Sequence, residues 1–299
     1  MMRHILEIDD LSSSELGRVL DLAASSDPAR VLTGKGMALI FEKPSARTRN
    51  SMEMAVVQLG GHPVYISANE IGLDTRESVE DVTNTMAGFH AAIGARVFQH
   101  STVERMAAVN RVPIVNLLSD QSHPMQALAD LLTMHREFGD LADRTVAYVG
   151  DANNVARSLA LGAGLAGMNF HISTPPGYGF NDADLDHVRL TGLTPKIFDR
   201  PEDAVAGADA VYTDAWTSMG QEEESEQRRR DFEAFTVDDR LMEFAQAEAI
   251  FLHCLPAHRG EEATDTVLDG PRSRIWVQAA NRMHAARGLL SWLINEAQE

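Results

Sequence analysis

Short apolar runs alternate with helical patterns along nearly the whole length of this 299-residue chain. The runs that we expect to form strands are residues 37–41, 64–67, 92–96, 113–117, 145–149, 169–173, 196–198, 210–213 and 249–254. Helical patterns lie between them, for example at residues 12–24, 51–59, 103–109, 125–138 and 155–164. Such alternation requires right-handed crossovers and therefore favours parallel sheets covered by helices. The sequence predicts an α/β fold.

A change of domain is expected at residues 139–144, where a long helical pattern ends and a new strand begins. A chain of this length can form two domains of ordinary size, each with its own core. We therefore expect two doubly wound parallel-sheet domains joined by a hinge, at residues 1–138 and 139–284. The last helix, at residues 285–299, is expected to pack back on the first domain.

Composition excludes several classes of protein. The net charge of −18 opposes binding to nucleic acid, because a phosphate backbone would be repelled. No apolar run approaches the length of a membrane span, and the N-terminal residues do not form a signal peptide. The single cysteine, Cys254, excludes an internal disulfide framework and fits a reducing cytoplasm. We expect a cytoplasmic protein that binds neither nucleic acid nor membrane.

One turn in the first half has the composition of an anion site. The apolar run from Ala38 to Phe41 leads into a turn rich in hydroxyls that carries Arg47 and Arg49, and residues 51–59 follow as a helix. Free N–H groups at a helix start favour an anion, and a guanidinium matches a phosphate with paired hydrogen bonds. A helix N-cap followed by two solvated arginines is the alternative. Because the chain is acidic, an anion site needs such local arginine.

Polar clusters recur at the ends of the expected strands. They are Arg96, residues 123–126, residues 150–154, residues 214–220, residues 253–256 and residues 281–284. In open α/β sheets, ligands bind in the crevice beyond the carboxyl ends of the strands. The repetition predicts that these clusters form a single functional region.

Taken singly, most of these features also have an ordinary structural explanation. His123 could be a loop histidine that caps a helix, Asp214 could cap a turn, and Cys254 could be a small buried apolar residue. Residues 150–154 lack the glycines of a dinucleotide-binding loop, which disfavours that function. The charged run at residues 221–230 is either a solvated loop or a mobile lid.

Together the clusters resemble the signature set of the ornithine carbamoyltransferases. The four motifs are Ser45-Ala46-Arg47-Thr48-Arg49, His123-Pro124-Met125-Gln126, Asp214 with Ser218-Met219-Gly220, and His253-Cys254-Leu255-Pro256. The first two are shared with aspartate carbamoyltransferases, and the last two point to ornithine. The resemblance implies a carbamoyl phosphate domain, an ornithine domain, a homotrimer with active sites at subunit boundaries, and a role in arginine biosynthesis.

The resemblance also implies the reaction and its residues. The carbamoyl group of carbamoyl phosphate would pass to the δ-amine of L-ornithine, giving L-citrulline and phosphate with no metal or organic cofactor. Carbamoyl phosphate would be bound by Ser45, Ala46, Arg47, Thr48, Arg96, His123, Gln126, Cys254, Leu255 and Arg282. Ornithine would be bound by Asn154, Asp214, Ser218 and Met219.

Among these residues, Thr48, Arg96 and His123 are expected to polarise the carbonyl oxygen as the tetrahedral intermediate forms. Arg47 would hold the phosphate, Gln126 would orient the carbamoyl amide, and Cys254 would meet the δ-amine. The residues expected to be catalytic are therefore Arg47, Thr48, Arg96, His123 and Cys254.

Two residues depart from the family pattern. Ala46 stands where threonine is usual, which removes a hydroxyl but keeps the backbone N–H. Glu70 stands where glutamine is frequent and would repel a phosphate, unless its loop is displaced or it pairs with Arg49 or Arg76. Two other functions therefore stay open: a sister carbamoyltransferase acting on putrescine, aspartate or an acylated ornithine, and a non-catalytic paralogue that binds ligand without turnover.

Overall fold

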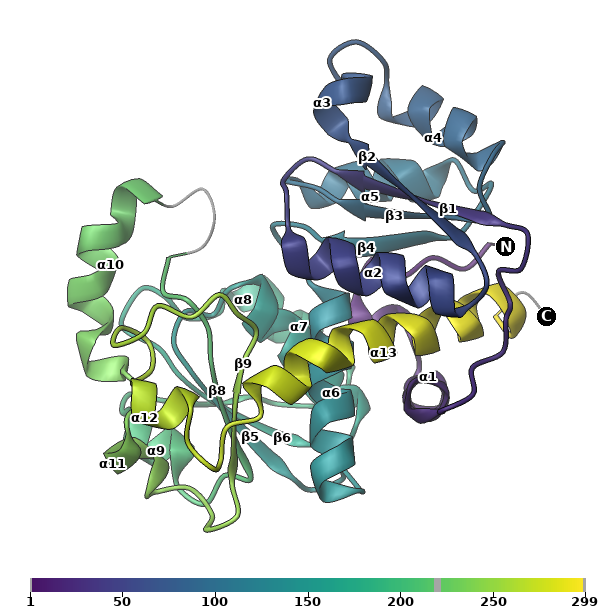
Figure 1. Cartoon of the computed structure of the whole chain (residues 1–299). Helices are drawn as coiled ribbons and strands as arrows, with labels where there is room; N and C mark the ends of the chain where they lie inside the picture. The colour runs from purple at the N-terminus through teal and green to yellow at the C-terminus, as the bar shows by residue number, and fades with distance from the viewer. Residues whose placement is uncertain (1, 218–221, 298–299) are drawn as a thin grey trace. The chain divides into compact units, whose positions relative to one another are not determined.

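The computed structural model describes residues 2–217 and 222–297, and the chain divides into two compact units. The first unit comprises residues 1–132 and 280–299, and the second comprises residues 133–279. The divisions fall inside two helices, α6 (Pro124–Phe138) and α13 (Ile275–Asn295), a few residues before the predicted domain limits (Figure 1).

The first unit is built on a parallel sheet of four strands in the order β2-β1-β3-β4. The strands are β1 (Gly36–Phe41), β2 (His62–Ser67), β3 (Ala92–Arg96) and β4 (Ile114–Leu118). The helices between them are α2 (Ala46–Gln58), α3 (Ala68–Ile71), α4 (Val79–Ala87) and α5 (His100–Ala108), and the 3₁₀ helix η1 (Ile8–Asp10) and α1 (Ser13–Ala24) precede β1. All β1 residues after Gly36 are buried, as expected for a central parallel strand covered on both faces.

The strand order reverses direction between β1 and β3. After β1 the chain moves to β2 on one side, and it then crosses back to β3 and β4 on the other. The crevice at such a reversal is where open α/β sheets bind ligands. The loop after Phe41 carries Ser45, and β3 ends at Arg96; both residues were predicted to be functional.

The C-terminal helix α13 packs on α1 within the first unit, which confirms the prediction for the end of the chain (Figure 1). Gly288 permits the close approach, because a Cβ built there would lie 2.5 Å from the carbonyl oxygen of Val19. Arg287 donates to the carbonyl oxygens of Ala23, at 3.2 Å, and Ser25. The helix begins ten residues earlier than the sequence indicated.

The second unit has a parallel sheet of five strands in the order β7-β6-β5-β8-β9. The strands are β5 (Thr145–Val149), β6 (Asn169–Ser173), β7 (Lys196–Phe198), β8 (Ala210–Thr213) and β9 (Ile250–His253). The described helices are α7 (Asn154–Leu165), α8 (Asp182–Leu190), α9 (Pro201–Val205), α10 (Ser225–Phe232), α11 (Asp239–Met242) and α12 (Asp265–Leu268), with 3₁₀ helices η2 (Glu222–Glu224) and η3 (Glu233–Phe235). Here the order reverses between β5 and β8, so the predicted ornithine residues that follow these strands also lie at a reversal.

The charged run at residues 221–230 is helical in its described part, where η2 leads into α10. The two alternatives considered from the sequence, a solvated loop and a mobile lid, both missed this helix. The reason is that the anchor of α10 on the unit is an arginine, Arg228, which is buried although it looks like a surface residue in the sequence.

None of the helices described in residues 2–217 and 222–297 has the length and apolar character needed to cross a membrane.

Candidate active site

The first of the four motifs, residues 45–49, forms the N-cap and first turn of α2. The Ser45 side chain accepts a hydrogen bond from the Thr48 N–H at 3.3 Å and so caps the helix, which begins at Ala46. Sequence periodicity placed the helix start at residue 51, because the polar motif has no apolar face. Arg47 and Thr48 therefore lie within the helix rather than before it, and the Arg47 side chain is exposed. N–H groups of this first turn favour an anion.

Three polar side chains meet at the Thr48 hydroxyl. Arg96 Nη1 donates to Thr48 Oγ1 at 3.3 Å, and Arg282 Nη2 donates to the same oxygen at 3.2 Å. The Ser45 hydroxyl lies 3.2 Å away. Thr48, Arg96 and Arg282 are all at most 5% exposed. Residues far apart in the sequence thus place two buried guanidiniums beside the N-terminus of α2.

His123 is held neutral in this unit. Burial lowers its pKa well below the usual value, and the positive charges of Arg282 and Arg96 lower it further. Protonation of His123 would add a third positive charge to a buried region. A neutral imidazole can donate one N–H to a ligand oxygen, so the residue suits a hydrogen-bonding role better than an ionic one.

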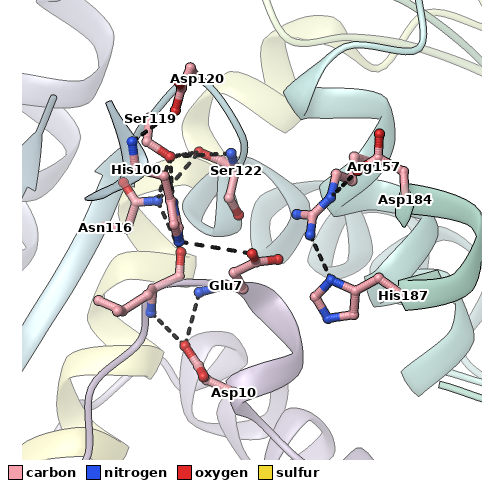
Figure 2. Close-up of polar contacts among 11 residues, drawn as sticks. Glu7, Asp10, His100, Asn116, Ser119, Asp120, Ser122, Arg157, Asp184 and His187 are labelled. Atoms are coloured by element: carbon pink, nitrogen blue, oxygen red, sulfur yellow. Dashed lines mark hydrogen bonds and ion pairs between the residues drawn. The ribbon is translucent and has the colours of Figure 1, made fainter. Parts of the chain in front are cut away.

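The loop that precedes His123 in the sequence is closely hydrogen-bonded, and Figure 2 shows its residues Ser119 and Ser122. Ser119 is its centre: its backbone N–H donates to the Ser122 carbonyl at 2.9 Å, and its hydroxyl accepts from the Ser122 N–H at 3.2 Å. The same hydroxyl lies 2.8 Å from His100 Nδ1 and accepts from Asn116 Nδ2 at 3.1 Å. These contacts fix the residue immediately before His123, and sequence analysis missed them.

Gln126 belongs to a buried chain of hydrogen bonds. Its Oε1 accepts from Arg282 Nη1 at 2.6 Å, and its Nε2 donates to Asp130 Oδ1 at 2.7 Å. The sequence led us to expect this carbonyl oxygen to accept from the carbamoyl amide. A carbonyl oxygen has a second lone pair, so the contact with Arg282 leaves room for that role.

In the second unit, the loop after β5 is joined to the loop after β8. Gly150 directly follows β5 and has φ at +141°, a conformation that favours glycine. Asn153 then caps α7, its Oδ1 accepting from Val155 N–H and Ala156 N–H at 2.9 and 3.1 Å. Its Nδ2 donates to Asp214 Oδ2 at 3.0 Å. The side chain that caps the helix therefore also orients the carboxylate.

Asp214 is also in contact with the cysteine of the fourth motif. Cys254 Sγ donates to Asp214 Oδ1 at 2.8 Å. The preceding His253 accepts the Leu255 N–H at its Nδ1, 2.9 Å away, and its Nε2 lies 3.0 Å from Glu262 Oε1. Because Nδ1 accepts, Nε2 carries the proton and donates to Glu262. Hydrogen bonds at both ring nitrogens of His253 therefore fix the loop that carries the Cys254 thiol.

The same region has the donor set of a metal site. Asp214, His253 and Cys254 each offer one ligand atom, and these atoms lie within 4.8 Å of one another. Carboxylate, imidazole and thiolate together suit Zn²⁺. Since both ring nitrogens of His253 already have hydrogen-bond partners, a metal would have to displace one of them.

A second buried arginine joins two helices of this unit (Figure 2). Arg157 in α7 donates from Nε to Asp184 Oδ1 at 2.8 Å, and its Nη2 lies 2.6 Å from His187 Nδ1. Both partners belong to α8. Arg157 therefore holds α7, the helix that Asn154 begins, against its neighbour.

The predicted residues fall into two groups, one in each unit. The first unit brings together Ser45, Thr48, Gln126, Arg96 and Arg282 by direct contacts, and His123 is coupled to the two arginines by charge. Asp214 and Cys254 meet in the second unit, and Asn154 begins α7 beside Asn153. Ser218 and Met219 lie outside the described residues.

Glu70 lies in the short helix α3 and is exposed. Of the two arginines proposed as its partners, Arg49 donates from Nε to Glu53 Oε1 at 2.8 Å and lies over the ring of Tyr65 at 3.9 Å.

Two family models match nearly all of the chain. A model for the carbamoyl-P binding domain of aspartate/ornithine carbamoyltransferase matches residues 3–136, and a model for the Asp/Orn binding domain matches residues 142–293. The chain belongs to the aspartate/ornithine carbamoyltransferase family.

Individual relatives of high similarity are ornithine carbamoyltransferases, which confirms the resemblance seen in the motifs. The enzyme from Thermus thermophilus is 46% identical over 296 residues, covering 98% of this chain and 97% of its own. That from Acidothermus cellulolyticus is 47% identical over 306 residues, covering 99% and 98%. The solved structure from Pyrococcus furiosus is 41% identical, has a TM-score of 0.92, and covers 97% of this chain and 96% of its own.

Proposed function

We propose that this chain transfers the carbamoyl group of carbamoyl phosphate to the δ-amine of L-ornithine, giving L-citrulline and phosphate. The observation that carries the proposal is the buried convergence of Arg96 and Arg282 on the Thr48 hydroxyl, at the N-terminus of a helix. In a chain with a net charge of −18, such local positive charge favours a small anion with several oxygens. Full-length relatives that are ornithine carbamoyltransferases support the choice of acceptor.

Carbamoyl phosphate binds in the first unit. Its phosphate is held by Ser45 Oγ, the Ala46 N–H, Arg47 and Thr48. Its carbonyl oxygen faces Thr48, Arg96 and neutral His123, and its amide is oriented by Gln126. Arg282 contributes a further contact, and we also assign Cys254 and Leu255, which belong to the second unit, to the binding of carbamoyl phosphate. The loss of one hydroxyl at Ala46 leaves the backbone N–H to bind the phosphate.

Ornithine binds through residues of the second unit. Asp214 pairs with its α-ammonium, and Asn154 and the Met219 backbone bind its carboxylate; Ser218 is the fourth residue assigned to ornithine. Support comes from the contacts of Asp214 with Asn153 and Cys254, which hold the carboxylate next to the thiol. Cys254 then meets the δ-nitrogen.

The chemistry requires few protein groups. The neutral δ-nitrogen attacks the carbamoyl carbon, a C–N bond forms, and the carbonyl oxygen takes up negative charge. Arg96, His123 and Thr48 stabilise that charge as it develops. The C–O bond to phosphate then breaks, and the nitrogen passes its extra proton to the departing phosphate. Much of the acceleration comes from holding the two reactants in contact and excluding water.

We also propose that the chain acts as a cytoplasmic homotrimer in arginine biosynthesis, with active sites at subunit boundaries. Apolar side chains exposed on the first unit support association. Met54 and Val57 lie near one another on α2 and are 46% and 49% exposed, and Phe89 is 71% exposed. Sedimentation equilibrium should give three times the monomer mass of 32.7 kDa; a monomer would contradict the assembly.

A panel of amines separates the proposed function from its alternatives. Carbamoylated product is measured from carbamoyl phosphate with ornithine, putrescine, aspartate and N-acetylornithine in turn. The proposal predicts citrulline from ornithine and little product from the others. A preference for another amine would support a sister transferase, and ligand binding without turnover would support the non-catalytic paralogue.

A further inference from the structure

A single buried arginine sets α10 apart from an ordinary charged surface helix. Arg228 is 5% exposed, whereas its neighbours Arg229 and Arg230 are exposed. Burying a guanidinium is costly unless it is paired and hydrogen-bonded, so its partners indicate why it is there.

Arg228 contacts three separate loops of the second unit and its own helical segment. Nη1 donates to Asp151 Oδ2 at 2.8 Å and to the Trp216 carbonyl oxygen at 2.9 Å. Nε donates to Glu224 Oε2 at 3.0 Å. The guanidinium also lies over the ring of Tyr178, 5.0 Å from its centroid. These partners follow β5, β8 and β6, so the arginine joins loops that open from three strands.

An aromatic cluster reinforces the same connection. Phe232 lies one turn beyond Arg228 on α10 and is fully buried. It stacks on Trp216 at a centroid distance of 5.8 Å and meets Tyr178 edge-on at 4.7 Å. One face of α10 therefore contacts two of these loops by both polar and apolar groups.

The two loops joined by Nη1 carry the residues assigned to ornithine. Asp151 lies three residues before Asn154, and Trp216 lies two residues after Asp214. Burial raises the pKa of Asp151, and its hydrogen bond from Arg228 opposes that rise. Without Arg228, the Asp151 carboxylate, whose side chain is only 12% exposed, would lose its cationic partner, and the Trp216 carbonyl would lose a hydrogen-bond donor.

We propose that Arg228 is a positioning residue for the amino-acid substrate, acting through Asp151 and the Trp216 carbonyl to fix the loop that leads into Asn154 and the loop that carries Asp214. The inference rests on the proposed function, because it assumes that these loops bind ornithine. It assigns part of the ornithine affinity to a side chain on α10 (Figure 1).

Steady-state kinetics on Arg228→Met, Arg228→Lys and the control Arg230→Met test the proposal. Arg230 is exposed, and its side chain donates to Gln227 Oε1 at 2.9 Å within the same helix. Arg228→Met should raise the KM for ornithine by about tenfold or more, as loss of a group that orients binding residues commonly does. The KM of Arg228→Met for carbamoyl phosphate should stay close to wild type. Both KM values of Arg230→Met should also stay close to wild type. The KM of Arg228→Lys for ornithine should lie between those of wild type and Arg228→Met, since lysine keeps the charge but not the planar guanidinium.

A folded Arg228→Met with the wild-type KM for ornithine would overturn the proposal, as would an equal rise in both KM values. If Arg228→Met does not fold, Arg228→Lys decides: an unchanged ornithine KM overturns the proposal, and a selective rise supports it. Wild-type protein that makes no citrulline would instead reject the proposed function, so the two failures are distinguishable.

Discussion

At the scale of single residues, the first unit combines a phosphate turn with groups suited to a developing oxyanion. Thr48 is where the two meet, because its backbone belongs to the capped start of α2 and its hydroxyl accepts from Arg96 and Arg282. The arginines are buried and fixed before any ligand arrives. Preorganised donors of this kind stabilise charge without the cost of reorganisation.

Arg47 should be the dominant contact for the phosphate, because it is exposed in the first turn of α2 and is free to reach a ligand. Arg47→Ala should abolish activity and weaken carbamoyl phosphate binding by roughly tenfold to a hundredfold, the range for a lost hydrogen bond to a charged group. Calorimetry measures the affinity. Arg49→Ala serves as the control, since Arg49 is bonded to Glu53. Unchanged affinity in Arg47→Ala would remove the assignment.

His123 should make stability depend on pH. Its pKa is lowered in the folded protein by burial, Arg282 and Arg96, and returns to about 6.5 on unfolding. Below that pH the unfolded chain binds a proton that the folded chain does not. The free energy of unfolding should therefore fall as the pH decreases, by up to about 1.4 kcal/mol per pH unit from this residue. Melting curves of ligand-free protein should show a steeper acid-side slope for wild type than for His123→Asn. Equal slopes would show that His123 does not carry the effect.

Cys254 should matter for ornithine rather than for folding. A δ-ammonium resembles lysine, with a pKa of roughly 10.4, and only the neutral amine attacks. We expect kcat/KM for ornithine to rise with pH through the neutral to mildly alkaline range. Cys254→Ala should fold, bind carbamoyl phosphate nearly normally, and lose ornithine affinity and turnover, because the thiol beside Asp214 is gone. If Cys254→Ala instead had the same kinetics as wild type across that pH range, Cys254 would have only a packing role.

At the scale of secondary-structure elements, helix packing in the first unit depends on a glycine. Ala is a better helix former than Gly by about 1 kcal/mol, yet Gly288→Ala should destabilise the protein. The added Cβ would lie 2.5 Å from the Val19 carbonyl oxygen of α1, and such overpacking typically costs about 1 to 3 kcal/mol. Gly17→Ala is the matched control, because Gly17 lies in α1 with no atom within 4 Å of its Cβ position, and should raise the melting temperature. A higher melting temperature for Gly288→Ala would refute the close packing.

The strands were the most predictable elements. Their apolar β-branched runs gave bounds that match exactly or nearly so, as at β3, β5 and β6, because buried parallel strands leave a continuous apolar signal. Helices that begin with polar residues were harder to predict from the sequence. The beginning of α2 carries two arginines instead of an apolar face, so its helical character depends on capping and tertiary contacts.

Candidate site residues were found from the sequence where a strand end and a family motif coincided. The resemblance suggested Thr48, Arg96 and Arg282, and their contacts at one hydroxyl agree with that grouping. Supporting residues were not found. Asn153 and Arg228 were inside segments singled out as polar or charged, but no pattern in the sequence distinguishes a buried anchor from a solvated side chain.

At the scale of the whole molecule, the two units each carry residues for one substrate of a single proposed reaction. The family models divide the chain in the same sense, into a carbamoyl-P binding domain and an Asp/Orn binding domain. Because the δ-amine must reach the carbamoyl carbon, binding of one substrate should influence binding of the other. That dependence is a coupling free energy, and it must be reciprocal.

Calorimetric titration with norvaline measures this coupling most directly. Norvaline is an ornithine mimic that lacks the δ-amine, so it can bind without reacting. We predict much tighter norvaline binding in the presence of saturating carbamoyl phosphate, by roughly fivefold to 150-fold for a typical coupling, and loss of that gain in Arg47→Ala. Equal norvaline affinity with and without carbamoyl phosphate would contradict the claim that the residues of the two units serve one reaction.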